Sequence, residues 1–596
     1  MTPDEVKSLP SGELPALASK VRRRMLESVS RNGGHLASSL GAVELAIALV
    51  RVFDPAKDRV LWDVGHQAYA WKLLTGRDER FDTLRRFGGI SGFPNPDESP
   101  CDAFVAGHAG AALAAAEGLA VARDRLGGTE HVVAVVGDAA LANGMALEAL
   151  NDCTKRTKRL VLVVNDNGSA TSAAPLGALL ESAGFEVTRR IDGHDIAAME
   201  DVFAMAKAAL GPIAVPVTTV KGKGFLPAEA DPTAWHGVGP FCIGDSAAPR
   251  PASGWSDVFG AAVCAAARRD SRVCALTAAM REGTGLVPFA SEFPDRFFDV
   301  GICEEHLVTF AAGLAKGGMR PVVAVYSTFL QRAIDQVMHD VCLMNLPVVF
   351  GIDRAGAVGA DGRTHHGMFD IPMLRCLPNL SILQPKDAAE LAAMVDAALA
   401  RNAPTAIRYP RGVPFVFKDV KVDKDVKVDK DVKVVRDVKG DKDVKDVKAC
   451  KDVKDSKDLK DVNDLKWGKA EQISSPDAPI QLWALGDQVA KALAVAALLE
   501  ARGVQAGVVN ARFVKPFDAE LLARQRSGGA RIISLENGAV AGGFGEAIGA
   551  DMRFGWPDEF VAHGSVAELE AAHGLAPEAI AESILRDGPF EGNGRP

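Results

Sequence analysis

Long apolar runs, paired cysteines and a surplus of basic residues are all missing from this 596-residue sequence. No run approaches the roughly 20 apolar residues that cross a bilayer, and the first 20 residues have no apolar signal core. The nine cysteines form no CxxC pair, which argues against a zinc site and a disulfide framework. A formal net charge of −9 gives no electrostatic case for a nucleic acid partner. We therefore expect a cytoplasmic protein without membrane or nucleic acid partners.

The sequence has the length and apolar content of roughly three or four ordinary domains. Short β-branched runs alternate with helical patterns, which predicts α/β domains built on mostly parallel sheets. Proline-rich residues 231–255 interrupt this alternation as an expected linker. The predicted strands are 59–63, 132–136, 160–164 and 213–220, then 272–277, 320–326 and 346–352, and finally 481–486, 508–509 and 532–533.

A second interruption, residues 418–466, has an unusual repeat. A basic residue occupies every third position from Lys418 to Lys460, with Asp and Val filling most of the gaps. A period of three matches neither a helix nor a strand, and few large apolar side chains are present to offset the entropy of ordering. We expect a charged, solvated linker.

Polar residues follow two predicted strands where each strand ends. Gly137-Asp138 follows one apolar run, and Asn165-Asp166-Asn167 follows the next, with a predicted helix over 141–151 between them. Parallel strands bring such ends to the same edge of a sheet. One carboxylate and one amide oxygen suit Mg²⁺, and loop backbone beside a helix start can hold phosphates. Alternatively, these residues only cap helices and turns.

Further motifs occur along the chain in a fixed order. They are Gly33-Gly-His-Leu36, Trp62-Asp-Val-Gly-His-Gln-Ala-Tyr69, Gly301-Ile-Cys-Glu-Glu-His306, Tyr326-Ser-Thr-Phe-Leu-Gln-Arg-Ala333, Asp353-Arg-Ala-Gly-Ala-Val-Gly-Ala-Asp-Gly362 and Arg408-Tyr-Pro-Arg-Gly412. In this order they resemble the 1-deoxy-D-xylulose-5-phosphate synthase family of the transketolase superfamily. The resemblance covers nearly the whole chain apart from residues 418–466.

The resemblance implies a three-domain transketolase-like fold. The expected parts are a diphosphate and magnesium domain (1–230), a pyrimidine-binding domain (256–417) and a transketolase C-terminal domain (467–596). It implies a thiamine diphosphate- and Mg²⁺-dependent transferase acting in isoprenoid and thiamine biosynthesis, and a homodimer. Such an enzyme decarboxylates pyruvate and condenses the two-carbon unit with glyceraldehyde 3-phosphate, giving 1-deoxy-D-xylulose 5-phosphate and CO₂.

The resemblance also assigns roles to particular residues. Glu304, His35, His66 and His365 match catalytic groups, with Glu304 bonded to the pyrimidine. Asp138, Asn167 and the Ser169 carbonyl match metal ligands. Arg85, Tyr326, Arg354, Asp361 and Arg411 match substrate-binding residues. Cofactor contacts fall on His66, Gly107, His108, Ala109, Ala139, Ala140, Asn167, Phe225 and Glu304.

This chain departs from the family pattern in three places. Residues 107–112 lack the serines common in the family, Ala139 replaces a glycine, and the stretch after Asn167 is short. A cofactor-contacting hydroxyl lost there would cost about 0.5–1.5 kcal/mol. Two alternatives therefore stay open: another thiamine diphosphate enzyme of transketolase or acyloin-forming type, and a non-catalytic relative.

Overall fold

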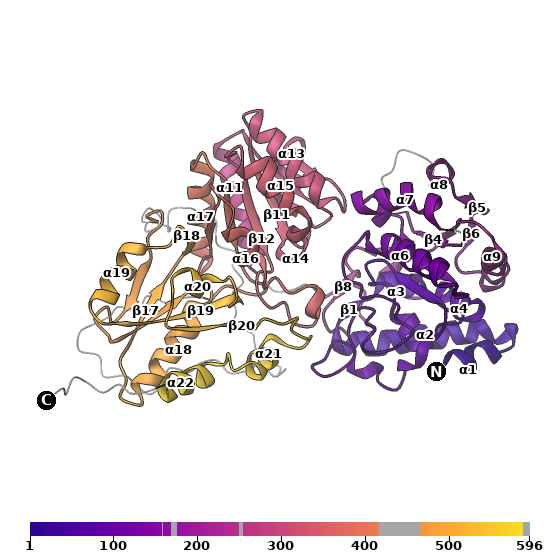
Figure 1. The fold of residues 1–596 in the computed structure, drawn as a ribbon, viewed down its shortest axis with the longest axis horizontal. Coiled ribbons are helices and arrows are strands. Elements are labelled where there is room, and N and C mark those ends of the chain that lie inside the picture. Colours follow the sequence, from indigo (N-terminus) through magenta and orange to yellow (C-terminus); the bar gives the residue numbers. More distant parts are fainter. Residues whose placement is uncertain (158, 169–175, 250–253, 416–464, 588–596) are drawn as a thin grey trace.

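Three α/β units make up the protein, and they follow one another along the chain (Figure 1). The computed structural model describes residues 1–157, 159–168, 176–249, 254–415 and 465–587. All but the last two residues of the predicted charged linker, 418–466, lie outside these residues. Among the helices of the described residues, none has the length and apolar character that crossing a membrane requires.

The first unit is built on a six-stranded parallel sheet in the order β2-β3-β4-β7-β5, with β6 also paired to β7. Successive residues of a strand point to opposite faces, so Val133 and Val135 enter one hydrophobic cluster while Ala134 and Val136 enter another. Helices cover both faces, which explains the continuous apolar runs in the sequence. The strands are β2 (Arg59–Trp62), β3 (Val132–Gly137), β4 (Val161–Asp166), β5 (Glu186–Val187), β6 (Ile191–Asp192) and β7 (Ile213–Thr218).

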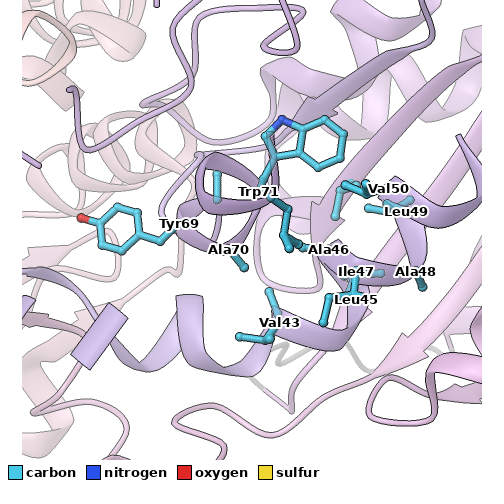
Figure 2. Packing of buried hydrophobic residues seen from close by; sticks show 14 of the residues in the cluster. Val43, Leu45, Ala46, Ile47, Ala48, Leu49, Val50, Tyr69, Ala70 and Trp71 are labelled. Atoms are coloured by element: carbon cyan, nitrogen blue, oxygen red, sulfur yellow. The ribbon is translucent and has the colours of Figure 1, made fainter. Parts of the chain in front are cut away.

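One face of this sheet is covered by α4 and α9, and the other by α6 and α7. Figure 2 shows residues of α4 packed with Trp71, and residues 43 and 45–50 of that helix are all fully buried. A helix with apolar side chains all round belongs in a core. The helices of the unit are α1 (Pro3–Ser8), α2 (Leu14–Asn32), α3 (Ala37–Gly41), α4 (Val43–Val52), α5 (Tyr69–Lys72), α6 (Ala111–Leu126), α7 (Gly144–Arg156), α8 (Leu176–Ser182), α9 (Ile196–Ala208) and α10 (Leu226–Ala230).

The second unit has a seven-stranded sheet in the order β10-β9-β11-β12-β14-β13-β18. Its edge strand β18 (Phe513–Lys515) comes from the third unit and pairs antiparallel with β13, so the two units share a sheet. The other strands are β9 (Val273–Thr277), β10 (Phe297–Asp299), β11 (Arg320–Tyr326), β12 (Val349–Asp353), β13 (Ser381–Leu383) and β14 (Thr405–Arg408). The helices are α11 (Trp255–Arg269), α12 (Val287–Glu292), α13 (Glu304–Lys316), α14 (Ser327–Leu330), α15 (Ile334–Gln336), α16 (Asp370–Arg375) and α17 (Ala388–Ala400).

The third unit has a five-stranded sheet in the order β15-β17-β16-β19-β20, parallel except for β15. The predicted fold class, with mostly parallel sheets flanked by helices, is confirmed. The strands are β15 (Glu471–Ser474), β16 (Ile480–Ala484), β17 (Ala506–Asn510), β19 (Arg531–Ala539) and β20 (Met552–Trp556). The helices are α18 (Gln488–Glu500), α19 (Ala519–Ser527), α20 (Phe544–Ala547), α21 (Val566–Ala572) and α22 (Pro577–Arg586).

Two sequence predictions need correction. The helix expected over 141–151 starts as a short 3₁₀ turn, and α7 begins only at Gly144, because the Asn143 side chain accepts a hydrogen bond from the Met145 amide and caps it. The expected linker 231–255 is wrong in its first part. Trp235 is buried in the core of the first unit, and β8 (Gly237–Val238) pairs with β1 (Gly34–His35). Proline-rich composition did not reveal this burial.

Candidate active site

The carboxyl ends of β3 and β4 meet at one edge of the first sheet. Gly137 pairs with Asn165, and the Asp138 amide donates to the Asn165 carbonyl at 3.2 Å. Asp138, which is buried, and Asn167, which is half-buried, therefore follow neighbouring strand ends. Asp138 and Asn167 thus reach one sheet edge, as the sequence predicted, whereas Ser169 lies outside the described residues.

The Asn165 side chain is used within the protein and is not available to a ligand. Its amide donates to Gln67 Oε1 at 2.7 Å, and its Oδ1 accepts from the Thr219 hydroxyl at 2.6 Å. Both bonds are buried, so Asn165 holds strand ends together and leaves Asp138 and Asn167 as the ligand candidates.

The loop that begins α6 is ordered by Asp63, the aspartate of the Trp62–Tyr69 motif. Its carboxylate accepts from the amides of Gly110 and Ala112 at 2.9 and 3.0 Å. A carboxylate at a helix N-terminus satisfies amides that have no partner within the helix. Ala109 and Ala140 are buried in the same hydrophobic cluster under α6, and Ala139 lies beside them, half-buried.

Gly107 and His108 join this loop to the second unit. His108 Nε2 lies 2.9 Å from both the Thr328 hydroxyl and the Thr364 carbonyl. A Cβ on Gly107 would lie 2.5 Å from Thr364 Cβ, so glycine permits the close approach of the two units there. The first sheet edge is thereby held against the second unit.

Histidines from separate segments form a cluster beside this junction. The ring centroids of His35 and His66 lie 6.3 Å apart, and His236 lies 5.6 Å from His35 and 5.3 Å from His66. Sequence reasoning missed His236 because it follows β-poor, proline-rich residues. Its place directly before Gly237–Val238, which pairs with the His35 strand, is known only from the structure.

Phe93 connects this cluster to His365 of the second unit. Its ring stacks on His365 with centroids 4.6 Å apart and planes 16° apart, and it lies 5.3 Å from His35. Phe93 is buried, so its ring occupies a fixed place between the two imidazoles. Phe93 was also not among the site residues predicted from the sequence.

These imidazoles are neutral at pH 7. Burial lowers the pKa of His35 and His66 well below the ordinary value, and lowers the pKa of His365 to about 3 and of His236 to about 4. A neutral imidazole has one nitrogen that donates and one that accepts a proton. The cluster can therefore exchange protons with a bound oxygen.

Charged groups, among them Asp361, Arg85 and Arg354, lie near His365. Asp361 accepts from Arg85 at 2.6 Å and pairs with Arg411 at 3.3 Å. Burial would raise the pKa of Asp361, but Arg85 and its other neighbours hold that pKa well below the ordinary value. The Arg354 guanidinium lies 3.6 Å from the Tyr326 ring centroid, and burial lowers its pKa to about 9. All five predicted substrate residues thus fall in one region.

Three non-glycine residues of this region have left-handed backbone. Val64, Arg85 and Arg354 have φ of 58°, 64° and 59°. Such values are uncommon, and for β-branched valine they are true outliers. Strain of this kind persists where surrounding structure enforces it and concentrates at functional sites.

Glu304 is the first residue of α13 and is buried at the junction with the first unit. Asn143 Nδ2 donates to the Ile302 carbonyl at 3.1 Å, and Cys303 Sγ donates to the Ala142 carbonyl at 3.4 Å. Among the described residues, Glu304 Oε2 has no hydrogen-bond partner. Burial raises the pKa of Glu304 to about 7. The carboxyl is thus poised to hydrogen-bond a ligand group.

Phe225 and Lys221 come from one glycine-rich turn but have different surroundings. Phe225 packs in the core of the first unit, with its centroid 5.0 Å from Trp235 and 6.2 Å from Phe241. Lys221, from the same turn, lies near Asp138. Burial lowers the pKa of Lys221, and the charge of Asp138 offsets only part of that shift. Sequence reasoning named Phe225 and passed over Lys221.

The unpartnered polar atoms of the site fit a bound thiamine diphosphate. The buried Oε2 of Glu304 and the Nδ1 atoms of His35 and His66 lack partners among the described residues, as does Nη1 of Arg354. Buried polar atoms left so are costly unless a ligand or water bonds them. No cluster of three or more His, Cys, Asp or Glu in the described part of the chain could hold a metal ion. The predicted Mg²⁺ ligands are one carboxylate, one amide and one backbone carbonyl, so they are not a cluster of that kind.

Comparison with known proteins defines first a class and then a family. Residues 252–414 match the family model for the transketolase pyrimidine-binding domain, and residues 468–580 match the transketolase C-terminal domain. The chain is thus a transferase of transketolase type. Residues 1–182 match the family model described as 1-deoxy-D-xylulose-5-phosphate synthase.

Relatives along almost the whole chain complete the assignment. 1-Deoxy-D-xylulose-5-phosphate synthase 1 of Geobacter sulfurreducens is 40% identical over 97% of this chain and 95% of its own length. Synthase 2 of that organism is 41% identical over 98% of both chains, and the Symbiobacterium thermophilum synthase is 41% identical over 97% and 93%. The chain belongs to the 1-deoxy-D-xylulose-5-phosphate synthase family. A Pichia stipitis transketolase variant is similar at 18% identity over 96% of both chains, with a TM-score of 0.44.

Phe93→Leu should lower kcat/KM about tenfold to hundredfold, because small misplacements of catalytic groups have effects of this size. Leucine keeps an apolar side chain but removes the ring that stacks on His365. Steady-state kinetics with pyruvate and glyceraldehyde 3-phosphate test this. The control is Phe53→Leu, which shortens another buried phenylalanine that contacts a histidine, His131, outside the cluster. Equal losses of kcat/KM in both variants would show that the Phe93 effect comes from general destabilisation of the fold.

The raised pKa of Glu304 should appear in the pH dependence of stability. Its value rises from 4.5 to about 7 on folding, so the folded protein binds this proton more tightly. The resulting stabilisation is full below pH 4.5 and is lost as pH rises through 7, by at most about 3 kcal/mol. Urea unfolding of the cofactor-free protein should show wild type losing stability relative to Glu304→Gln over this range. Parallel pH profiles would contradict burial of the carboxyl.

Proposed function

We propose that this chain is a 1-deoxy-D-xylulose-5-phosphate synthase. It decarboxylates pyruvate and joins the two-carbon unit to D-glyceraldehyde 3-phosphate, giving 1-deoxy-D-xylulose 5-phosphate and CO₂ for isoprenoid and thiamine biosynthesis. The observation that carries this proposal is the junction of the first two units. There the Asn143–Ile302 and His108–Thr364 contacts link the first unit to the second, which carries Glu304, and Glu304 Oε2 has no partner among the described residues.

Thiamine diphosphate, when bound, would supply the nucleophilic carbon and the stabilisation of negative charge that decarboxylation requires. Glu304 would bond the pyrimidine ring, and its buried carboxyl suits that bond because a pKa raised to about 7 allows it to give up and take up a proton near neutral pH. Asp138, Asn167 and the Ser169 carbonyl would hold Mg²⁺, a cation that prefers oxygen ligands. The remaining cofactor contacts would come from His66, Gly107, His108, Ala109, Ala139, Ala140 and Phe225.

The neutral histidines would handle protons at the substrate oxygens. His35, His66 and His365 would act as general acids and bases, because each lies in the cluster and a neutral imidazole has one nitrogen that donates and one that accepts a proton. His236 lies against His35 and His66 and would share this role.

A cationic group would bind the phosphate of the acceptor. Arg354 and Arg411 provide planar guanidinium groups, Tyr326 supports Arg354 through its ring, and Arg85 with Asp361 would bind the hydroxyl end. Guanidinium geometry suits phosphate oxygens.

Arg354→Met should raise KM for glyceraldehyde 3-phosphate about tenfold to hundredfold, because one or two charge-assisted hydrogen bonds are lost. KM for pyruvate should change little, and turnover of unphosphorylated glyceraldehyde should not suffer. Steady-state kinetics with both aldehydes measure this. Arg272→Met, which removes an exposed arginine paired with Asp270, is the control. An equal loss with both aldehydes would show that Arg354 does not bind phosphate.

Three broader properties belong to the same proposal. We infer a homodimer, a cytoplasmic location and the domain limits 256–417 and 467–596 for the second and third domains. The first domain, expected to end at residue 230, would extend through β8 (Gly237–Val238). Sedimentation and limited proteolysis of the purified protein test the first and last of these.

The function is tested by product analysis. Pyruvate with glyceraldehyde 3-phosphate should yield CO₂ and a deoxy-ketose phosphate, whereas pairs of sugar phosphates should give no transfer. Transfer between sugar phosphates would favour a transketolase, and pyruvate-only acyloin formation would favour another thiamine diphosphate enzyme. A non-catalytic relative would give no magnesium-dependent heat with millimolar cofactor in calorimetry.

A further inference from the structure

Residues 358–366 form a loop between β12 and α16 that presents three groups to the site. The Asp361 carboxylate bonds Arg85 at 2.6 Å, and the Thr364 carbonyl lies 2.9 Å from His108 Nε2. The His365 ring stacks on Phe93. This segment, named here the substrate loop, thus contacts the first unit through these three groups, and Arg363 adds an ion pair with Asp97 at 2.9 Å.

His366 closes the base of the substrate loop. Its Nδ1 accepts from the Val358 amide at 3.1 Å, and its Nε2 lies 3.0 Å from the carbonyl of Ala562 in the third unit. An amide can only donate and a carbonyl can only accept, so the ring is neutral with its proton on Nε2. Burial lowers the pKa of His366, and the side chain is 5% exposed. Both ring nitrogens are therefore used.

The third unit packs closely on the substrate loop around this bond. A Cβ on Gly362 would lie 2.8 Å from His563 Cβ, and a Cβ on Gly359 would lie 3.2 Å from the Gly564 carbonyl. A Cβ on Gly564 would lie 3.0 Å from Phe87, two residues after Arg85. The stretch before α21, which lies at the end of the third unit nearest the first (Figure 1), thus supports both partners of the Arg85–Asp361 pair.

We propose that His366 is a positioning residue through which the third unit fixes the substrate loop, and with it Asp361 and His365, for the reaction. The proposal rests on the proposed function, because it assigns those two residues to the substrate. His366 itself uses both ring nitrogens on backbone groups and acts only through the loop. The third unit, whose residues supply none of the predicted site groups, thereby acquires a part in catalysis.

Three variants separate the two bonds. His366→Gln places an amide nitrogen where Nε2 lies and keeps the bond to Ala562, whereas His366→Asn keeps an acceptor for the Val358 amide. His366→Leu keeps neither bond. Each is assayed as full-length holoenzyme for kcat, for both substrate KM values and for the dissociation constant of thiamine diphosphate. His339→Leu, an exposed histidine on the second unit, is the matched control.

His366→Leu should lower kcat/KM for glyceraldehyde 3-phosphate about tenfold to hundredfold, as expected for displaced groups, with cofactor affinity changed less than about threefold. His366→Gln should recover most of the loss, and His366→Asn should not. Recovery by Asn but not Gln, or kcat/KM within about twofold of wild type in all three variants, would overturn the proposal. If His366→Leu fails to fold, the Gln and Asn comparison decides the matter. If the wild-type protein forms no product from pyruvate and glyceraldehyde 3-phosphate, the proposed function itself is wrong.

Discussion

Replacing Glu304 by alanine should leave the fold intact and reduce turnover by about three orders of magnitude or more, within the range of general acid–base contributions. The carboxyl is buried and its Oε2 has no partner among the described residues, so no hydrogen bond of that oxygen within the protein is lost. What is lost is the group that would bond the pyrimidine. Turnover and thermal unfolding, measured side by side, give the result.

Glu305→Ala serves as the control, since it removes the adjacent, less buried carboxylate of the same helix turn. It should retain activity within about threefold of wild type. Near-normal turnover in Glu304→Ala, or a comparable loss in Glu305→Ala, would mean that the wrong glutamate has been assigned.

The second large effect concerns metal-dependent cofactor binding. Asp138→Asn should raise the dissociation constant of thiamine diphosphate in the presence of Mg²⁺ by about a hundredfold or more. Asp138 is the only charged group among the predicted ligands Asp138, Asn167 and Ser169, and Mg²⁺ is held chiefly through carboxylates and phosphates. Calorimetric titration with and without Mg²⁺ measures the change.

Asp152→Asn is the matched substitution, because Asp152 lies on α7 of the same unit and pairs with Arg156 at its surface. Cofactor affinity should be unchanged in this variant. Unaltered magnesium-dependent binding in Asp138→Asn would place the metal elsewhere.

The strand ends show what local sequence can specify. The run 132–136 ended at Gly137-Asp138 and the run 160–164 at Asn165-Asp166-Asn167, and parallel pairing of β3 with β4 brings these ends together. Sequence reasoning could make this step because a buried parallel strand has a continuous apolar run and its neighbours have a common direction. It could not separate the structural role of Asn165, which depends on Gln67 and Thr219 from other segments.

Three of the residues that were not predicted from the sequence share one property. Phe93, His236 and His366 stand in irregular segments without helical or strand periodicity, and each owes its role to distant partners. His236 follows the buried Trp235 in a stretch that composition alone assigned to a linker. His366 gains its role from Ala562, 196 residues further along the chain.

The sequence by itself determined the central parallel strands of the three α/β units, because a buried parallel strand has a continuous apolar run. The order of its motifs indicated the chemical groups needed for the proposed reaction. Only the tertiary structure decided which histidines meet, that β18 completes the second sheet, and that Ala562 supports the substrate loop. These features depend on how the units pack against one another, and packing joins residues whose separation along the chain carries no periodic signal.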